Sequence, residues 1–254
     1  MASKELQAAL DAAAAASAVI RAWYQRNPGV RLKPDASPVT EADVRSEEAI
    51  RTILSERFPA YGFYGEETGQ HAMEAESIWL VDPIDGTKAF VRGIPFFSTQ
   101  IALLRAGRLV LGVSSAPVYG ELVWAEEGAG AYLNDRPIRV SAVSRLSDAA
   151  VSTGNLRSLA DSPRWNRLGQ LIATAGYSRG YGDFVHYHLL ARGALEVVIE
   201  ASVNILDIAA LTVIVREAGG RFTDLEGREV GLETASVLAT NGALHATVLA
   251  ALAD

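Results

Sequence analysis

The stretch Ile78-Trp79-Leu80-Val81-Asp82-Pro83-Ile84-Asp85-Gly86-Thr87 is the most informative part of this chain. Its apolar start, Ile78 to Val81, is typical of a short buried strand. The residues that follow combine acid, proline and glycine, which predicts a turn. We therefore expect two carboxylates, Asp82 and Asp85, at the carboxyl end of a strand.

The sequence on both sides of this stretch predicts a layered α/β fold. Amphipathic helices are expected over Ser3–Gln25 and Thr40–Arg57, and β-rich runs predict an antiparallel meander over Ser98–Tyr132. After about Ser141 strands and helices alternate. The expected elements there are strands near 149–152, 195–200, 222 and 237, and helices over 164–175, 183–192, 205–218 and from 242 onwards. We expect an N-terminal α+β half, residues 1–140, and a C-terminal α/β half, residues 141–254, that share a cleft.

Composition restricts the kinds of partner. The 254 residues carry a formal net charge of −7 and no clustered Lys and Arg, which argues against a nucleic-acid partner. Charges interrupt every long apolar run, so no membrane span is expected. Cysteine is absent, which excludes disulfides and thiolate ligands and favours a cytoplasmic location. Any metal site must use oxygen or imidazole ligands.

Each acidic position, taken alone, has an ordinary explanation. Glu66 and Glu67 are compatible with a solvated loop pair, and Asp85-Gly86 with a plain turn. Asp207 lies near a predicted helix start, where a carboxylate is favoured. Asp43 follows Thr40 at the spacing of a capping box.

The ordinary explanations fail jointly at Asp82 and Asp85, because two like charges beside an apolar strand would repel each other. A hard divalent cation between them would remove the repulsion, and magnesium prefers oxygen ligands. Asp82 could bridge two ions that act together on a phosphate ester. The backbone N–H groups of Gly86 and Thr87 would form an anion site at a helix start. Four carboxylates of about −4 would balance two ions of about +4.

Three motifs in order resemble the inositol monophosphatase-like family of metal-dependent phosphatases. They are Gly65-Glu66-Glu67, the stretch from Trp79 to Thr87, and Leu206-Asp207-Ile208-Ala209-Ala210 followed by Glu217-Ala218-Gly219-Gly220. The resemblance covers nearly the whole chain. It implies a five-layer αβαβα sandwich, a small-molecule phosphomonoester as substrate, and a homodimer.

The resemblance also implies roles for individual residues. Glu66, Asp82 and the carbonyl of Ile84 would bind one magnesium ion, and Asp82, Asp85 and Asp207 a second. A third, weaker ion would lie near Glu66. Thr87, with Asp43 behind it, would orient or deprotonate the attacking water beside Glu66, while the amides of Gly86 and Thr87 would hold the phosphate.

The segment Arg179-Gly180-Tyr181-Gly182-Asp183-Phe184 most resembles the branch of this family that hydrolyses histidinol phosphate. Histidinol carries an ammonium group, which carboxylates at Asp183 and Glu200 would bind. We include Arg179 in the expected substrate site. The alternative for Asp183 is an N-cap of the helix after Gly182, and both roles can coexist.

Other functions stay open at this stage. A broad inositol, sugar or nucleotide monophosphatase would share the metal site and differ in the substrate pocket. A non-catalytic family member is disfavoured by the intact set of Glu66, Asp82, Asp85, Thr87 and Asp207. An interaction module gives no account of the packed carboxylates. Leu206 stands where many relatives have tryptophan, which is expected to alter the substrate wall. The histidines, including His186 and His188, lack a metal-ligand pattern, so we interpret them as packing or surface residues.

Overall fold

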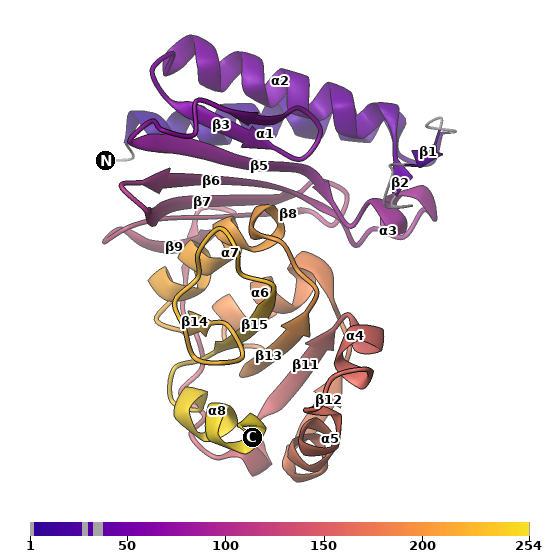
Figure 1. Ribbon diagram of the computed structural model, residues 1–254. Coiled ribbons are helices and arrows are strands. Elements are labelled where there is room, and N and C mark those ends of the chain that lie inside the picture. Colours follow the sequence, from indigo (N-terminus) through magenta and orange to yellow (C-terminus); the bar gives the residue numbers. More distant parts are fainter. Residues whose placement is uncertain (1–2, 27–29, 33–37, 254) are drawn as a thin grey trace.

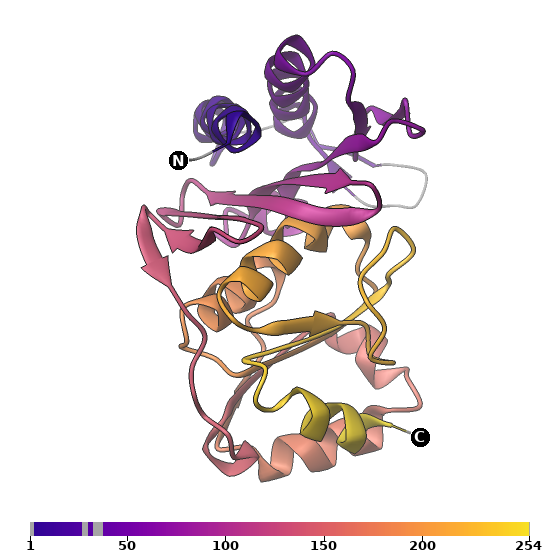
Figure 2. The ribbon, with the colours of Figure 1, turned by 90° about the vertical axis from the view of Figure 1, so that its left-hand side faces the viewer.

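The computed structural model describes residues 3–26, 30–32 and 38–253. These residues form five layers, in the order helices, sheet, helices, sheet, helices (Figures 1 and 2). The predicted α/β sandwich is confirmed. The division into halves near residue 140 stays a prediction, although the two sheets are built from residues on opposite sides of that point.

Two long helices form the first layer. Helix α1 (Lys4–Trp23) begins after Ser3, whose Oγ accepts a hydrogen bond from the Leu6 amide at 2.9 Å. Helix α2 (Glu41–Arg57) begins with the capping box expected at Thr40, because Asp43 accepts from the Thr40 amide at 2.7 Å. Both helices bury apolar residues against the first sheet, as predicted from their periodicity.

The first sheet has eight strands in the order β10-β9-β8-β7-β6-β5-β3-β4. Its strands are β3 (Gly62–Gly65), β4 (Gly69–His71), β5 (Ser77–Asp85), β6 (Ser98–Arg105), β7 (Arg108–Ala116), β8 (Glu121–Glu126), β9 (Gly130–Leu133) and β10 (Arg136–Ile138). Strand β3 pairs with β5 in parallel, and the other pairs are antiparallel. The meander is therefore confirmed, while β3, β4 and β10 were not predicted because they are short.

Strand β5 differs from the prediction at its carboxyl end. The expected turn from Asp82 onwards is wrong, since β5 continues to Asp85 with a shift of register against β6 between Asp82 and Asp85. Pro83 has no N–H to donate, and such an irregularity accommodates it. The turn comes at Gly86, whose φ is +89°. Helix α3 (Thr87–Val91) follows immediately (Figure 1).

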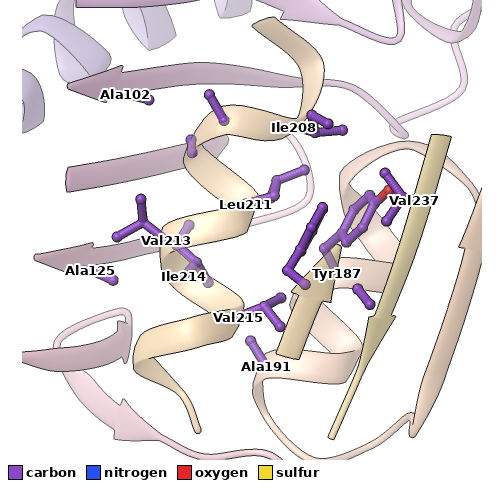
Figure 3. Packing of buried hydrophobic residues seen from close by; sticks show 14 of the residues in the cluster. Ala102, Ala125, Tyr187, Ala191, Ile208, Leu211, Val213, Ile214, Val215 and Val237 are labelled. Carbon is purple, nitrogen blue, oxygen red and sulfur yellow. The ribbon is translucent and has the colours of Figure 1, made fainter. Parts of the chain in front are cut away.

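The middle layer contains α6 (Asp183–Ala191) and α7 (Ile205–Glu217). Helix α7 is apolar on nearly all sides, as expected of a helix between two sheets. In Figure 3 its side chains fill the space between Ala102 and Ala125 of the first sheet and Tyr187 and Val237 on the other side. This cluster joins the two sheets into one core.

The second sheet has five strands in the order β12-β11-β13-β15-β14. They are β11 (Ala150–Gly154), β12 (Tyr177–Arg179), β13 (Val197–Ala201), β14 (Arg221–Thr223) and β15 (Ser236–Thr240). The outer layer and connections add α4 (Leu156–Ala160), α5 (Trp165–Thr174), α8 (His245–Leu252), the short 3₁₀ helix η1 (Leu146–Asp148) and the pair β1 (Arg31–Leu32) and β2 (Pro38–Val39). Within the described residues no helix combines the length and apolarity that a bilayer span needs.

Candidate active site

A cleft of about 240 Å³ lies where β5, α3, α6, β13 and α7 meet, a size suited to a small molecule. Five carboxylates and one lysine are among the charged groups of its lining. The lining residues are Pro38, Glu66, Asp85, Gly86, Thr87, Lys88, Ala89, Asn155, Asp183, Tyr187, Glu200, Ser202, Val203, Asp207, Ile208 and Leu211. The sequence-predicted acidic residues are therefore brought together.

Strand β5 carries Asp85 to the lining of the cleft, whereas Asp82 lies next to Asp85 and Asp207 but is not among the lining residues. We call these three aspartates the floor of the cleft. The Asp82 side chain is buried, and its Oδ1 accepts from the Ile84 amide at 2.9 Å. Thr99 on the neighbouring strand donates to the Pro83 carbonyl at 2.8 Å and so holds the irregular segment. The register shift thus allows both carboxylates to face the same place.

Helix α7 carries the third carboxylate, Asp207. Its Oδ2 accepts from the Asn204 amide at 3.0 Å, and Asn204 caps the helix in return. The capping interpretation is correct, yet Asp207 also reaches the strand residues. One oxygen each of Asp82, Asp85 and Asp207 lies within 4.8 Å of the others, close enough to bind one ion together.

The burial and crowding of these carboxylates raise their pKa values. Burial, followed by the charges of Glu66, Asp85 and Asp207, raises the pKa of Asp82 well above its usual range. Burial, followed by the charges of Asp183, Asp207, Glu200 and Glu66, does the same to the pKa of Asp85. Burial raises the pKa of Asp207 to about 6, with Glu66 and Glu200 adding to the effect. Such a donor set fits a divalent cation, whose charge would remove the repulsion.

Glu66 enters the cleft from the loop after β3. Its amide donates to the Val81 carbonyl of β5 at 3.1 Å, which continues the parallel pairing of the two strands. Its side chain lines the cleft, and its charge raises the pKa of Asp82. Glu66 therefore lies with the three aspartates although it comes from a different strand.

Thr87 and Asp43 form the contact that the resemblance implied. Thr87 Oγ1 lies 3.1 Å from Asp43 Oδ1 and 2.9 Å from the Ile84 carbonyl. One hydroxyl has one proton, so it donates to only one of these oxygens at a time. Burial raises the pKa of Asp43, although hydrogen bonds from Thr40 and Thr87 oppose that rise.

Asp183 and Glu200 are two further carboxylates of the cleft lining. Asp183 is the first residue of α6, with a φ of +45°, and Gly182 precedes it in the cap position. No side-chain hydrogen bond caps this helix, so the N-cap alternative is not supported. Burial, followed by the charge of Glu200, raises the pKa of Asp183 to about 6, while His186 and Lys88 oppose it. Glu200, at the end of β13, is only 5% exposed.

Two side chains contact the Glu200 carboxylate. Tyr187 donates to Glu200 Oε2 at 2.7 Å, and His186 Nε2 lies 3.1 Å from the same oxygen. His186 Nδ1 lies 3.3 Å from Ser152 Oγ. This Ser–His–Glu series is no nucleophilic triad, because Ser152 is fully buried and accepts from the Tyr181 amide. The histidines are packing or surface residues, as predicted, since His186, His188 and His245 are buried and His71 is exposed. His186 also supports a cleft residue.

Two expectations do not agree with the cleft. Arg179 lies exposed on β12, stacks 4.5 Å from the Tyr177 ring centre and is not among the lining residues, so its substrate-binding role stays an unsupported prediction. Leu206 is buried in the core between the sheets and does not form the cleft wall. Leu206 belongs to the apolar cluster through which α7 packs between the two sheets.

Several lining residues were missed. Tyr187, Asn155 and Lys88 have no acidic or glycine-rich signal of their own. Tyr187 follows His186 directly in a predicted helix, and only the fold shows that both reach Glu200. Asn155 Nδ2 lies 3.3 Å from Glu200 Oε1 and comes from the distant loop after β11.

Comparison with known protein families matches residues 1–254 to the inositol monophosphatase family. The chain belongs to the inositol monophosphatase family. A histidinol-phosphatase of Mycobacterium tuberculosis is 42% identical over 228 residues, covering 88% of this chain and 87% of that protein. An inositol-1-monophosphatase of Mesorhizobium japonicum is 36% identical over 234 residues, covering 89% and 87%. The crystal structure of extragenic suppressor protein suhB from Bartonella henselae has a TM-score of 0.91 and 34% identity, covering 98% of each chain.

Membership of the inositol monophosphatase family confirms the resemblance and the fold. The chain is a phosphoric monoester hydrolase of this metal-dependent family. The acidic cluster is the place where metal could bind, and a small-molecule phosphate ester fits the family.

Proposed function

We propose that this chain is a magnesium-dependent histidinol-phosphate phosphatase, which converts histidinol phosphate and water to histidinol and phosphate. The carrying observation is the surplus of negative charge in the cleft. Two or three ions at Glu66, Asp82, Asp85 and Asp207, with the Ile84 carbonyl as a further ligand, would neutralise the floor. Asp183 and Glu200 would then still attract a cation, and the substrate's ammonium group is one.

The chain's own residues account for the other requirements of hydrolysis. When bound, the divalent ions would stabilise negative charge on the phosphate and lower the pKa of a water. When Thr87 Oγ1 donates its proton to Asp43, its lone pairs would be free to accept a hydrogen bond from the attacking water. The amides of Gly86 and Thr87 would bind the phosphate. No covalent enzyme intermediate is required.

The donors around Glu200 support the choice of a cationic substrate. Tyr187 and His186 hold its carboxylate in place. The Tyr187 hydroxyl does so without carrying a positive charge. A carboxylate oriented in this way gives a charge-assisted hydrogen bond to an ammonium group. Among the described lining residues, Lys88 alone carries a positive charge.

A broad inositol or sugar monophosphatase is the second candidate. The similarity to an inositol-1-monophosphatase favours it, and hydroxyl groups of a polyol can also donate to Asp183 and Glu200. A nucleotide phosphatase would use the same metal site, and a non-catalytic member is the weakest alternative because the carboxylate set is complete.

A substrate panel separates these candidates. Phosphate release would be measured with magnesium on histidinol phosphate, inositol 1-phosphate, fructose 1,6-bisphosphate and adenosine 3′,5′-bisphosphate, and compared by kcat/KM. We expect a preference for histidinol phosphate. Comparable values on the polyol and sugar phosphates would contradict the specific proposal and support a broad monophosphatase, and no release at all would support a non-catalytic protein.

The proposal includes the oligomeric state, the cellular location and the pathway of the protein. Family resemblance supports a homodimer, and the absence of cysteine from the sequence agrees with a cytoplasmic location. A phosphatase that acts on histidinol phosphate would serve histidine biosynthesis. Sedimentation of the purified protein would test the dimer.

A further inference from the structure

Helix α2 presents two carboxylates to the active-site side of the molecule, one turn apart. Asp43 and Glu47 are four residues apart, so they lie on the same face of the helix. Both side chains are fully buried. Asp43 contacts Thr87, while the proposed function gives Glu47 no task.

Glu47 binds the loop that carries Glu66. Its Oε2 accepts from the Glu67 amide at 2.8 Å, and its Oε1 accepts from the Thr68 amide at 2.7 Å. Two consecutive backbone donors thus converge on one carboxylate directly after Glu66. Because these bonds are charge-assisted and buried, they fix the backbone at that point strongly.

Gly65 makes this approach possible. A methyl group added to Gly65 would overlap the Glu47 carboxylate, whose Oε1 and Cδ are its nearest neighbours, and would crowd the Phe63 ring. The φ of Gly65 is not in the left-handed region, so space rather than backbone conformation requires glycine here. In the Gly65-Glu66-Glu67 motif, Glu66 lines the cleft, and Gly65 leaves the space that the Glu47 carboxylate occupies.

We propose that Glu47 is a positioning residue, which fixes the Glu66 loop relative to Thr87 and thereby sets the affinity of the site for magnesium. Asp43 and Glu47 attach the Thr87 hydroxyl and the Glu66 loop to one rigid helix. The inference rests on the proposed function, because it takes Glu66 as a metal ligand. It differs from a merely structural clamp, which would stabilise the loop without affecting the metal.

The test compares Glu47→Gln with Glu48→Gln. Glu48 is the exposed neighbour on the same helix, so its variant removes the same charge without touching the loop. Glutamine at 47 keeps the size but places an NH₂ group against one of the two amide donors. The magnesium concentration that gives half of the maximal rise in Tm, and that for half-maximal activity, would be measured for each.

We expect the half-saturating magnesium concentration to rise about 10-fold or more in Glu47→Gln, with kcat at saturating magnesium within about twofold of the wild type. Glu48→Gln should match the wild type in both. A lower Tm in Glu47→Gln with an unchanged magnesium requirement would overturn the proposal and make Glu47 a structural residue.

A second pair of variants decides the matter if Glu47→Gln does not fold. Gly65→Ala displaces the Glu47 carboxylate without removing it and should raise the magnesium requirement in the same direction. Gly169→Ala is its control, because an added methyl there meets only open space. An unchanged requirement in a folded Gly65→Ala variant would overturn the proposal.

Glu66→Gln separates this inference from the proposed function. If Glu66→Gln raises the magnesium requirement while Glu47→Gln and Gly65→Ala do not, the positioning role alone is wrong. If Glu66→Gln also leaves it unchanged, Glu66 is no metal ligand, and both the assignment and the inference fail.

Discussion

The floor aspartates and Glu200 have different neighbours. On the floor, Asp82, Asp85 and Asp207 face one another, and burial and repulsion raise their pKa values. Glu200 instead accepts a hydrogen bond from the Tyr187 hydroxyl, and His186 Nε2 lies against the same oxygen. Mutual repulsion on the floor favours a cation between the aspartates, whereas Glu200 has hydrogen-bonding side chains of its own. Under the proposed function, the floor holds the metal and Glu200, together with Asp183, binds the organic cation.

The strongest way to break the comparison is Asp82→Asn. This change keeps the size but removes the charge at the centre of the floor, so we expect kcat/KM to fall at least about 10³-fold with the fold intact. Steady-state kinetics and a thermal melt would measure both effects. Asp161→Asn, an exposed carboxylate after α4, is the control. Substantial residual turnover in Asp82→Asn would contradict the two-metal assignment.

A smaller, selective effect is expected on the substrate side. Asp183→Asn should lower kcat/KM for histidinol phosphate about 10- to 100-fold, because a charge-assisted hydrogen bond is worth about 1.5–3 kcal/mol. A neutral sugar phosphate should lose much less. Kinetics on the two substrates in parallel would show this, and equal losses would mean that Asp183 is structural.

The smallest effect concerns stability without metal. The pKa of Asp207 is raised from 3.8 to about 6, so its protonated form favours folding below pH 3.8, and that contribution is lost as pH rises through about 6. Asparagine at position 207 carries no charge at any pH, and its side-chain oxygen can still accept a hydrogen bond from the Asn204 amide. We expect the metal-free Tm of Asp207→Asn at pH 8 to exceed that of the wild type by about 2–6 °C.

With magnesium, the wild type should have a higher Tm than Asp207→Asn, because only the wild type has all of the proposed ligands. Thermal melts at pH 5 and pH 8, with magnesium and with a chelator, would show both effects. A variant that is less stable than the wild type without metal at pH 8 would contradict the crowding described for the floor.

The sequence predicted the elements whose pattern is long or local. The periodicity of 3–25 and 40–57 indicated α1 and α2, and the meander followed from β-rich runs between glycines. It missed β3, β4 and β10, which have too few residues for a period to show. The path of Asp82 to Asp85 was predicted as a turn because proline and glycine dominate local patterns, whereas pairing with β6 keeps it extended.

The sequence predicted the site residues that are acidic and belong to a motif. It did not predict the residues that reach the site from distant segments of the chain. Glu66, Asp85 and Asp207 meet in one cleft as their motifs indicated. The partners of Glu200 are different, because Tyr187, His186 and Asn155 come from other elements and only tertiary packing brings them together. Arg179 shows the converse, since it lies in a motif but outside the cleft.

The position of α7 between the two sheets has a consequence for the order of folding. Asp207 reaches Asp82 and Asp85 only when this helix is packed against the first sheet, and Figure 3 shows how closely its side chains fill that space. If these aspartates bind magnesium as proposed, a chain in which α7 has not yet docked lacks one of the ligands, and tight binding comes only late in folding. The ion should then slow unfolding far more than it speeds refolding, and so increase the kinetic stability of the folded protein.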